Sequence, residues 1–417
     1  MNVNDIPPDV LQLSEEAQSV LAGRFSEIDA VAFENTRKVM SAFQNNRVGE
    51  ACFAGTTGYG YDDLGRDTLD RIYAEIFHTE AALVRTGFVN GTHALTAGLF
   101  SLLAPGDTLL AVTGAPYDTL RKTVGTGEKE FGSLAFYGIN YAQVDLGKDG
   151  LPDIPAILEA LKDESVKAVF LQRSRGYELR KALSVKELGE VCTAVKSVRP
   201  DVSIMVDNCY GEFTELLEPT DVGADLVDGS LIKNPGGGLA PMGGYLAGKQ
   251  ILIERAACRL TTPGIGGECG ASIGTNRSLY QGLFVAPHVV AQALKTAVFC
   301  AYVMQKKGYK TSPAYDEARS DIIQMIEFND PDKMKAFCCG IQAGAPVDSY
   351  VTPEPWQMPG YEYPVIMAAG AFIQGSSIEL SADGPFVPPY TVYMQGGITY
   401  ESGRLGIMLA LSGINNK

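Results

Sequence analysis

The sequence predicts an α/β protein with a mostly parallel, seven-stranded sheet and a smaller α+β domain at its C-terminal end. Short apolar runs alternate with amphipathic stretches between residues 81 and 247, and several of these runs are apolar throughout. Strands that helices cover on both faces have this composition. After about residue 308 the segments shorten and Pro and Gly become frequent, which indicates a second unit. We therefore expect a helical arm at residues 1–50, a large domain at 51–290 and a small domain at 291–417.

The strands of the large domain are expected at seven apolar runs: Ala81–Arg85, Thr108–Val112, Ala142–Asp145, Ala168–Gln172, Ser203–Asp207, Leu226–Ser230 and Tyr245–Ala247. Helices are expected before and between them, at Arg66–Phe77, Thr92–Leu103, Pro116–Thr123, Asp153–Lys162 and Ser184–Ser197. In sheets of this kind, ligands bind beyond the carboxyl ends of the strands. The residues that directly follow each strand are therefore the first candidates for a functional site.

The spacing of apolar residues also predicts long helices before and after the region in which strands and helices alternate. Residues 9–46 show such spacing, and Gly23 is expected to divide them into two helices. A further helix is expected at Asn276–Lys307, with an interruption at Pro287. In the small domain we expect strands and helices at the following ranges: Asp321–Phe328, Ile366–Gln374 and Ser377–Leu380 for strands, Asp332–Ala343 and Thr399–Leu411 for helices.

Composition and charge argue against several classes of protein. The formal net charge of −15 disfavours binding to nucleic acids or anionic membranes, which requires a concentrated basic surface. The eight cysteines include no CxxC pair and there are only three histidines, so no metal site is expected. The N-terminus, MNVNDIPPDV, has no apolar signal core, and no segment approaches a membrane-spanning length. We expect a cytoplasmic protein with reduced thiols.

One lysine leaves a buried strand and enters a glycine-rich turn. Lys233 follows the run Leu226–Ser230 and precedes Pro235 and three consecutive glycines. Burial in apolar surroundings lowers the pKa of an amine, and the neutral amine is the form that condenses with a carbonyl group. We therefore expect Lys233 to hold an aldehyde cofactor as a Schiff base. The ordinary alternative is a solvated lysine in a turn.

Three other positions that follow strands could complete a cofactor site. Gly91 and Thr92 open a helix whose first backbone amides could bind phosphate. Tyr117 could stack on a planar ring, and Asp207 could keep a pyridine nitrogen protonated. Each residue also has an ordinary alternative role, as a helix start, a packing residue or a turn former. Their order along the chain, which ends with Lys233 one strand after Asp207, favours a cofactor site.

Six longer segments carry a resemblance to a known family: GYGYDDLGRDTLDRIYAEIF, LVRTGFVNGTHAL, QRSRGY, VDNCYGEF, SLIKNPGGGLAPMGGY and QGLFVAPHVVAQALK. They resemble the fold-type I pyridoxal 5′-phosphate (PLP) enzymes, and within them the cystathionine and methionine lyase group. The most similar family is labelled aluminium-resistance or methionine gamma-lyase-like proteins. The resemblance extends from about Leu11 to Leu411 and implies a fold-type I, PLP-dependent transferase-like fold with PLP as the cofactor.

This resemblance implies a role for each candidate residue. Lys233 would be the Schiff-base lysine and proton shuttle, and Asp207 would be the partner of the pyridinium nitrogen. Tyr117 would stack on the ring and belong to the catalytic residues. The residues expected to hold the phosphate within one subunit are Asn90, Gly91, Thr92 and Ser230.

Tyr59 matches a tyrosine that, in the related lyases, reaches the phosphate of a neighbouring subunit. The resemblance therefore implies a homotetramer with shared active sites. Two departures from the family pattern concern this loop and the lysine. Tyr61 stands where the relatives have an arginine, and Ile232 stands where they have a hydroxyl residue. Despite these departures, PLP remains the expected cofactor. The substrate specificity, however, need not match that of the related lyases.

An amino-acid substrate needs a cation for its carboxylate, and a guanidinium is the best geometric match. The resemblance favours Arg404, and Arg173 and Arg175 in QRSRGY are the local alternatives. The implied activity is that of a carbon–sulfur lyase. It would abstract the α-proton of a cystathionine-like or methionine-like amino acid and eliminate the sulfur group.

Other functions share part of this pattern. An aldolase or an aminotransferase would have the same cofactor residues, and a protein with the PLP fold could act in aluminium resistance indirectly. A nucleotide-binding protein could use NPGGGLAPMGG as a phosphate loop. This alternative is disfavoured because the glycines follow the lysine and no GxxxxGK[ST] motif is present.

Overall fold

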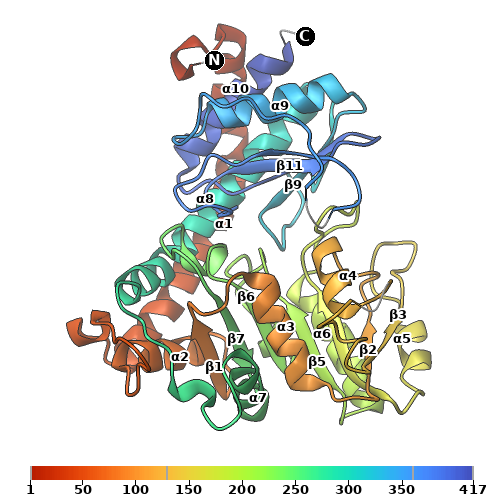
Figure 1. Ribbon diagram of the computed structural model, residues 1–417. Coiled ribbons are helices and arrows are strands. Elements are labelled where there is room, and N and C mark those ends of the chain that lie inside the picture. The colour runs from red at the N-terminus through yellow and green to blue at the C-terminus, as the bar shows by residue number, and fades with distance from the viewer. Residues whose placement is uncertain (1, 128–129, 359–360, 416–417) are drawn as a thin grey trace.

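A seven-stranded sheet forms the centre of the larger of two lobes in the computed structural model, which describes residues 2–127, 130–358 and 361–415 (Figure 1). Its strands are β1 Ala81–Arg85, β2 Thr108–Ala111, β3 Asn140–Gln143, β4 Val166–Gln172, β5 Ser203–Asp207, β6 Leu226–Ser230 and β7 Gly244–Gly248. The strand order is β1-β7-β6-β5-β4-β2-β3, and strands β2 to β6 run parallel. β7 is antiparallel to both of its neighbours. The predicted mostly parallel, seven-stranded sheet is confirmed.

Helices cover both faces of this sheet, which explains why its strands are apolar throughout. They are α2 Leu64–Ile76, α3 Gly91–Leu102, α4 Asp118–Val124, α5 Ile154–Ala160, α6 Val185–Val198 and α7 Gln250–Leu260. On β5, Met205 packs in the hydrophobic cluster under α3 and α7, whereas Ile204 and Val206 pack in the cluster under α2, α5 and α6. Successive side chains of a strand point to opposite faces, so each face of the sheet has its own core. α7 has no counterpart among the predicted helices.

The smaller lobe contains an antiparallel sheet of five strands. Its strands are β8 Lys310–Ser312, β9 Ile323–Glu327, β10 Val365–Ala368, β11 Ser381–Pro385 and β12 Thr391–Gln395. Their order is β10-β11-β12-β9-β8, and the helices α9 (Pro331–Ala343) and α10 (Tyr400–Asn415) lie on the side away from the large lobe (Figure 1). The predicted strand at residues 377–380 is wrong. That segment forms a turn, in which the Glu379 N–H donates to the Ser376 carbonyl oxygen, and the strand begins at Ser381.

Two long helices, α1 (Pro8–Asn45) and α8 (Asn276–Lys306), pack against each other and contact both lobes. Both are continuous, so the predicted breaks at Gly23 and Pro287 are wrong. A glycine inside a helix costs only about 0.5–1 kcal/mol relative to alanine, and buried apolar residues along α1 offset that cost. Pro287 is itself buried in the densely packed α8. Tertiary packing therefore overrides the local preference at both positions.

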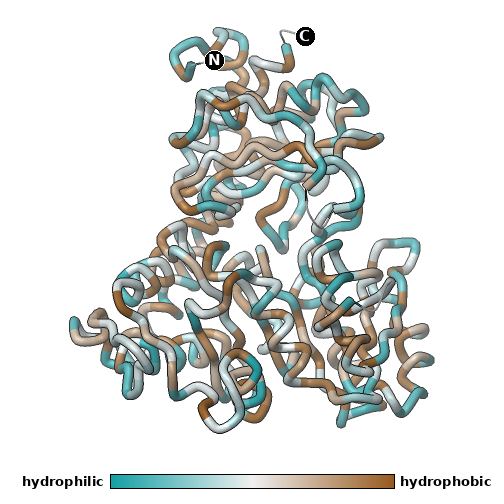
Figure 2. Tube along the Cα trace, in the orientation of Figure 1, coloured by the Kyte–Doolittle hydropathy of each residue, from teal (hydrophilic) through white to brown (hydrophobic). Residues whose placement is uncertain are grey.

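α8 is long and apolar enough to cross a membrane by length and composition, but 72% of its most apolar window is buried inside the protein. Such burial is typical of a core helix. The helix contacts β8, β9 and α10 in the small lobe and the Lys233 turn in the large lobe. Hydrophobic residues likewise concentrate in the interiors of both lobes (Figure 2). Residue 290 lies within α8, and the expected domain limits at residues 50 and 290 stay predictions.

Candidate active site

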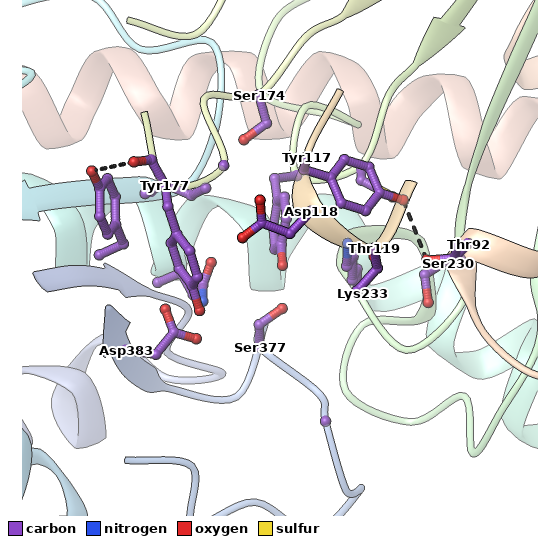
Figure 3. A pocket seen from close by; sticks show the side chains of 18 of the residues that line it. Thr92, Tyr117, Asp118, Thr119, Ser174, Tyr177, Ser230, Lys233, Ser377 and Asp383 are labelled. Atoms are coloured by element: carbon purple, nitrogen blue, oxygen red, sulfur yellow. Dashed lines mark hydrogen bonds between the residues drawn. The ribbon is translucent and has the colours of Figure 1, made fainter. Parts of the chain in front are cut away.

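A cavity of about 570 Å³ has walls from both lobes (Figure 3). One wall lies at the carboxyl ends of β4, β5 and β6, where Gln172, Asp207 and Ser230 end their strands. The other wall is the face of the small sheet that carries Asp383 and Tyr393. The position matches the rule for ligand sites in open α/β sheets, and the volume is in the range of small-molecule sites.

The structure brings most of the predicted cofactor residues together in this cavity. They come from the start of α3, the start of α4, the end of β5 and the turn after β6. The predicted residues that line it are Asn90, Gly91, Thr92, Tyr117, Arg175, Asp207, Ser230 and Lys233. Tyr59, Arg173 and Arg404 are not among the described residues that line it.

The backbone after β6 folds into a tight turn that fixes the position of Lys233. The lysine is followed by a short 3₁₀ helix, η4 (Asn234–Gly236). A Cβ atom on Gly236 would overlap the carbonyl oxygen of Leu231, and one on Gly237 would overlap that of Gly282 in α8. Gly237 also has a φ of 54°, which L side chains rarely adopt. The glycines therefore allow the turn to pack closely against both the strand end and α8.

Acidic groups surround the Lys233 amine. Its Nζ lies 4.0 Å from the centre of the Tyr210 ring. Burial by itself lowers the pKa of Lys233, but Cys209, Tyr210 and Asp207 raise this pKa well above its ordinary value. The pKa of the free Lys233 amine is therefore shifted upward, opposite to the effect expected from burial alone, because Cys209, Tyr210 and Asp207 share the buried site. A raised pKa favours the protonated amine, which has to lose its proton before it acts as a nucleophile.

Asp207 is held in a fixed orientation at the end of β5. The side chain is 5% exposed, and its Oδ1 accepts a hydrogen bond from the Cys209 backbone N–H at 3.1 Å. Burial raises the pKa of Asp207, whereas Lys233 and the Cys209 amide lower it. A buried carboxylate needs a cationic partner, and a protonated pyridine nitrogen is such a partner.

The start of α3 and the end of β6 form a corner suited to phosphate. The Asn90 side chain caps α3 by accepting the His93 N–H at 2.8 Å. The N–H groups of Gly91 and Thr92 belong to the first turn of the helix, where backbone donors point outward and attract anions. A Cβ atom on Gly91 would lie 3.2 Å from the Cβ of Ser230, so glycine permits the close approach of these two segments.

Tyr117 borders this corner at the N-terminus of α4. Its hydroxyl lies 3.3 Å from the Thr92 Oγ1, and its backbone N–H donates to the Gln172 side chain at 3.3 Å. Burial, and then the charge of Asp207, raises the pKa of Tyr117 well above its ordinary value, so the phenol stays protonated. The stacking of this ring on a cofactor stays a prediction.

These residues match PLP in their chemistry. An amine for the aldehyde, a buried carboxylate for the ring nitrogen, an aromatic ring, and helix amides with a hydroxyl for the phosphate all line one cavity. Lys233 and Asp207 lie after neighbouring parallel strands, β6 and β5. The residues present therefore fit the cofactor that the sequence predicts.

The structure places the three candidate arginines in different surroundings. Arg404 lies on α10, where its Nε donates to Ser14 at 2.6 Å and its Nη2 to Glu15 at 2.6 Å. Arg173 is fully buried and forms an ion pair with Glu215 at 2.8 Å. Arg175 differs from both because it lines the cavity.

Arg175 is fully buried and retains free hydrogen-bond donors. Its Nη2 donates to the Ser312 hydroxyl at 3.3 Å. Its Nε and Nη1 have no hydrogen-bond partner among the residues that the structure describes. A buried guanidinium with unused donors is suited to a carboxylate ligand.

Several cavity residues have no counterpart in the sequence prediction. Asp228 lies in the middle of β6, in register with Asp207 on β5, and both of its carboxyl oxygens lack a partner within the described part of the chain. Burial, then Asp207 and Glu212, raises the pKa of Asp228 well above its ordinary value. Asp383, on the small sheet, is likewise buried. A charged residue inside an otherwise apolar strand could have revealed Asp228, whereas Asp383 reaches the cavity only through the packing of the two lobes.

Tyr59 lies on the surface of this subunit. It is 71% exposed and stacks on Tyr61 with ring centres 5.7 Å apart. A contact with the phosphate of another subunit stays a prediction.

Comparisons with known proteins agree with the geometry of the site. The family profile described as methionine gamma-lyase matches residues 10–415. The uncharacterized protein YnbB of Bacillus subtilis (strain 168) is 49% identical over 403 residues, which cover 96% of each chain. A crystal structure named as a carbon-sulfur lyase involved in aluminum resistance, from Clostridium novyi NT, is 53% identical with a TM-score of 0.94. The alignment covers 98% of this chain and 96% of that one.

A more distant structure shows the fold class. The PLP-dependent protein YhfS from Escherichia coli has a TM-score of 0.62 at 19% identity, with 94% of this chain and 97% of that chain covered. The expected fold-type I architecture is confirmed, and PLP is the cofactor of this chain.

Replacement of Lys233 should remove the covalent attachment of PLP. In the Lys233→Ala protein, the visible absorbance band of lysine-bound PLP should be absent, because no other amine is expected at the aldehyde. Borohydride reduction of the wild-type protein should fix the cofactor on the peptide that contains Lys233, as detected by mass spectrometry. Lys186→Ala, at a side chain that is 86% exposed, is the matched control and should keep the band. An unchanged band in Lys233→Ala would contradict the assignment.

Proposed function

The chain belongs to the methionine gamma-lyase family and is a PLP-dependent lyase, and we propose that it cleaves a carbon–sulfur bond of an amino acid such as cystathionine or methionine. One observation supports this proposal most strongly. Lys233, Asp207 and the partly unpaired Arg175 line the same cavity. They supply a base, a ring partner and a carboxylate ligand for an α-amino acid.

Bound PLP supplies an electron sink for the negative charge that develops when the α-proton leaves. Asp207 is proposed to hold a proton on the ring nitrogen, since its ionised form is stabilised by a cation. Lys233 is proposed to accept the α-proton at Nζ and to hold it close to the substrate. Because Lys233 lies in a rigid glycine-rich turn, its amine stays in the cavity during this transfer.

Arg175 is proposed to hold the substrate carboxylate. Its side chain is buried, so a charge-assisted hydrogen bond from Nε or Nη1 is strong and little screened by solvent. Arg180 supports the loop by donating from its Nη2 to the carbonyl oxygens of Gln172 and Ser174 at 2.9 and 2.6 Å. This loop therefore presents Arg175 to the cavity from a fixed backbone.

The sulfur group leaves in the second half of the proposed reaction. The electron pair left at Cα forms a double bond to Cβ as the Cβ–sulfur bond breaks, and the sulfur takes the electrons of that bond. The sulfur also takes up the proton that Lys233 removed, which gives a thiol, and water then releases the remaining fragment as a keto acid and ammonia. Tyr117 stays protonated and lies in the cavity, so it is proposed to contribute its ring face and its hydroxyl to this step. An aldolase or an aminotransferase would use the same cofactor residues, and the family membership favours the lyase.

We further propose that the protein acts in the cytoplasm as a homotetramer in which Tyr59 reaches a neighbouring active site. The exposure of Tyr59 and its stacking on Tyr61 support a role in subunit contact. Exposed aromatic residues are typical of protein interfaces.

The purified enzyme should release a thiol together with ammonia and a keto acid from L-cystathionine or L-methionine. A colorimetric thiol assay combined with keto-acid analysis by mass spectrometry measures these products. Release of a keto acid without a thiol would identify transamination and contradict the proposal. The Lys233→Ala protein supplies the background rate.

Arg175→Ala should raise the KM for the amino acid roughly ten- to a hundredfold, because a buried hydrogen bond to a charged group is lost. The cofactor absorbance should stay unchanged, since Arg175 is assigned to the substrate. Arg404→Ala is the matched control, and its KM should stay within about twofold of the wild-type value. A large increase for Arg404→Ala with none for Arg175→Ala would assign the carboxylate to Arg404 instead.

A further inference from the structure

The small lobe contributes a polar surface to the cavity that the proposed chemistry does not use. We call it the distal wall and define it as Ser376, Ser377, Ser381 and Asp383. Each of these side chains is at least nine-tenths buried. Their hydroxyl oxygens and the Oδ1 of Asp383 have no hydrogen-bond partner in residues 2–127, 130–358 and 361–415. Buried polar groups without partners are rare in folded proteins, so a cluster of them inside a cavity indicates a ligand.

The strand geometry aims Asp383 into the cavity. Side chains alternate along β11, so Ser381, Asp383 and Pro385 share one face, and all three line the cavity. The opposite face carries Gly384, where an added Cβ atom would lie 3.1 Å from Met334 of α9. In Figure 3, Asp383 and Ser377 extend from the small lobe, and Lys233 extends from the large lobe.

The carboxyl group on this wall has no cationic partner. Asp383 takes part in none of the ion pairs among the described residues, and the side chain that hydrogen-bonds to it is Tyr177. Burial raises the pKa of Asp383 to about 7, whereas the hydrogen bond with Tyr177 lowers it. A cation brought into the cavity would therefore meet a buried acid that is readily ionised.

We propose that Asp383 binds an ammonium group carried by the sulfur-containing leaving group of the substrate. The inference rests on the proposed carbon–sulfur lyase function and narrows its substrate class to thioethers that join two amino-acid moieties. Such a leaving group also carries a carboxylate, and the hydroxyls of Ser376 and Ser377 supply donors for it. Arg175 and Lys233 hold the reacting half of the substrate, and the distal wall holds the other half.

A substrate without the second ammonium leaves Asp383 unpaired. A site built around buried polar groups discriminates strongly against a ligand that fails to pair with them. The methyl group of methionine offers no donor to the distal wall. Methionine is therefore expected to be the poorer substrate.

The test compares two thioethers that differ only at the distal ammonium: L-cystathionine and S-(carboxypropyl)-L-cysteine. Wild-type kcat/KM, followed by thiol release, should favour cystathionine by roughly tenfold or more. Asp383→Asn keeps the volume and removes the charge. It should lower kcat/KM for cystathionine roughly tenfold or more, so that most of the preference is lost, and it should not lower kcat/KM for the carboxypropyl compound.

Two further variants control for indirect effects. Asp118→Asn replaces another carboxyl that lines the cavity but lies 3.7 Å from Arg121, and it should keep the wild-type preference. Ser381→Ala alters the wall beside Asp383 and should reduce the preference in the same direction, which keeps the test decisive if Asp383→Asn is unstable. Cofactor absorbance and melting temperature show whether each variant is folded.

The outcomes separate this inference from the function on which it rests. An unchanged preference in folded Asp383→Asn, or a wild-type enzyme that cleaves both thioethers equally well, would overturn the role of Asp383 and leave the lyase function standing. No thiol release from either compound by the wild-type enzyme would overturn both.

Discussion

The structure depends on a backbone contact that only glycine permits. Gly236 and Gly237 pack the turn after Lys233 against the end of β6 and against Gly282 of α8, where a side chain would overlap backbone atoms. This contact fixes the lysine at the carboxyl edge of the sheet. Because α8 also packs against β8, β9 and α10, it ties the same turn to the small lobe. The two walls of the cavity therefore share one rigid support, and the reactive lysine lies where that support meets the sheet.

The second constraint is electrostatic. Three buried acids, Asp207, Asp228 and Glu212, lie around a single buried amine, Lys233. Burial raises the pKa of Glu212 to about 8 and that of Asp228 well above its ordinary value, so burial favours the neutral form of both acids. Burial raises the pKa of Asp207 as well, whereas Lys233 and the Cys209 amide lower it. The position of Asp207 at the end of β5, where the Cys209 N–H donates to it, makes it the acid suited to a ring nitrogen.

Much of the site could be predicted because its residues follow strands of a parallel sheet. The carboxyl ends of such strands meet at one edge of the sheet. Residues that follow successive strands, such as Gly91, Asp207 and Lys233, are therefore expected to lie close together in the fold. No comparable sequence pattern predicts which residues of the small lobe will contact the large lobe. Asp383 belongs to a strand that begins four residues after the predicted one and meets the large lobe only in the folded chain. Arg404, which the resemblance favours, lies on α10 beside Glu15, and its role stays a prediction. The predictions of helix breaks at Gly23 and Pro287 were wrong for a related reason. The low helix propensity of one residue is outweighed by the stabilisation gained when the apolar face of a long helix is buried.

The cavity is proposed to bind a sulfur-containing amino acid whose α-proton Lys233 removes. Proton NMR can follow the Cα–H signal of the cysteine half of L-cystathionine while the holoenzyme turns over in D2O. This signal should disappear at a rate equal to or faster than thiol release, and Lys233→Ala should show neither change. Thiol release or α-proton exchange that persists in folded Lys233→Ala protein would contradict the role of Lys233.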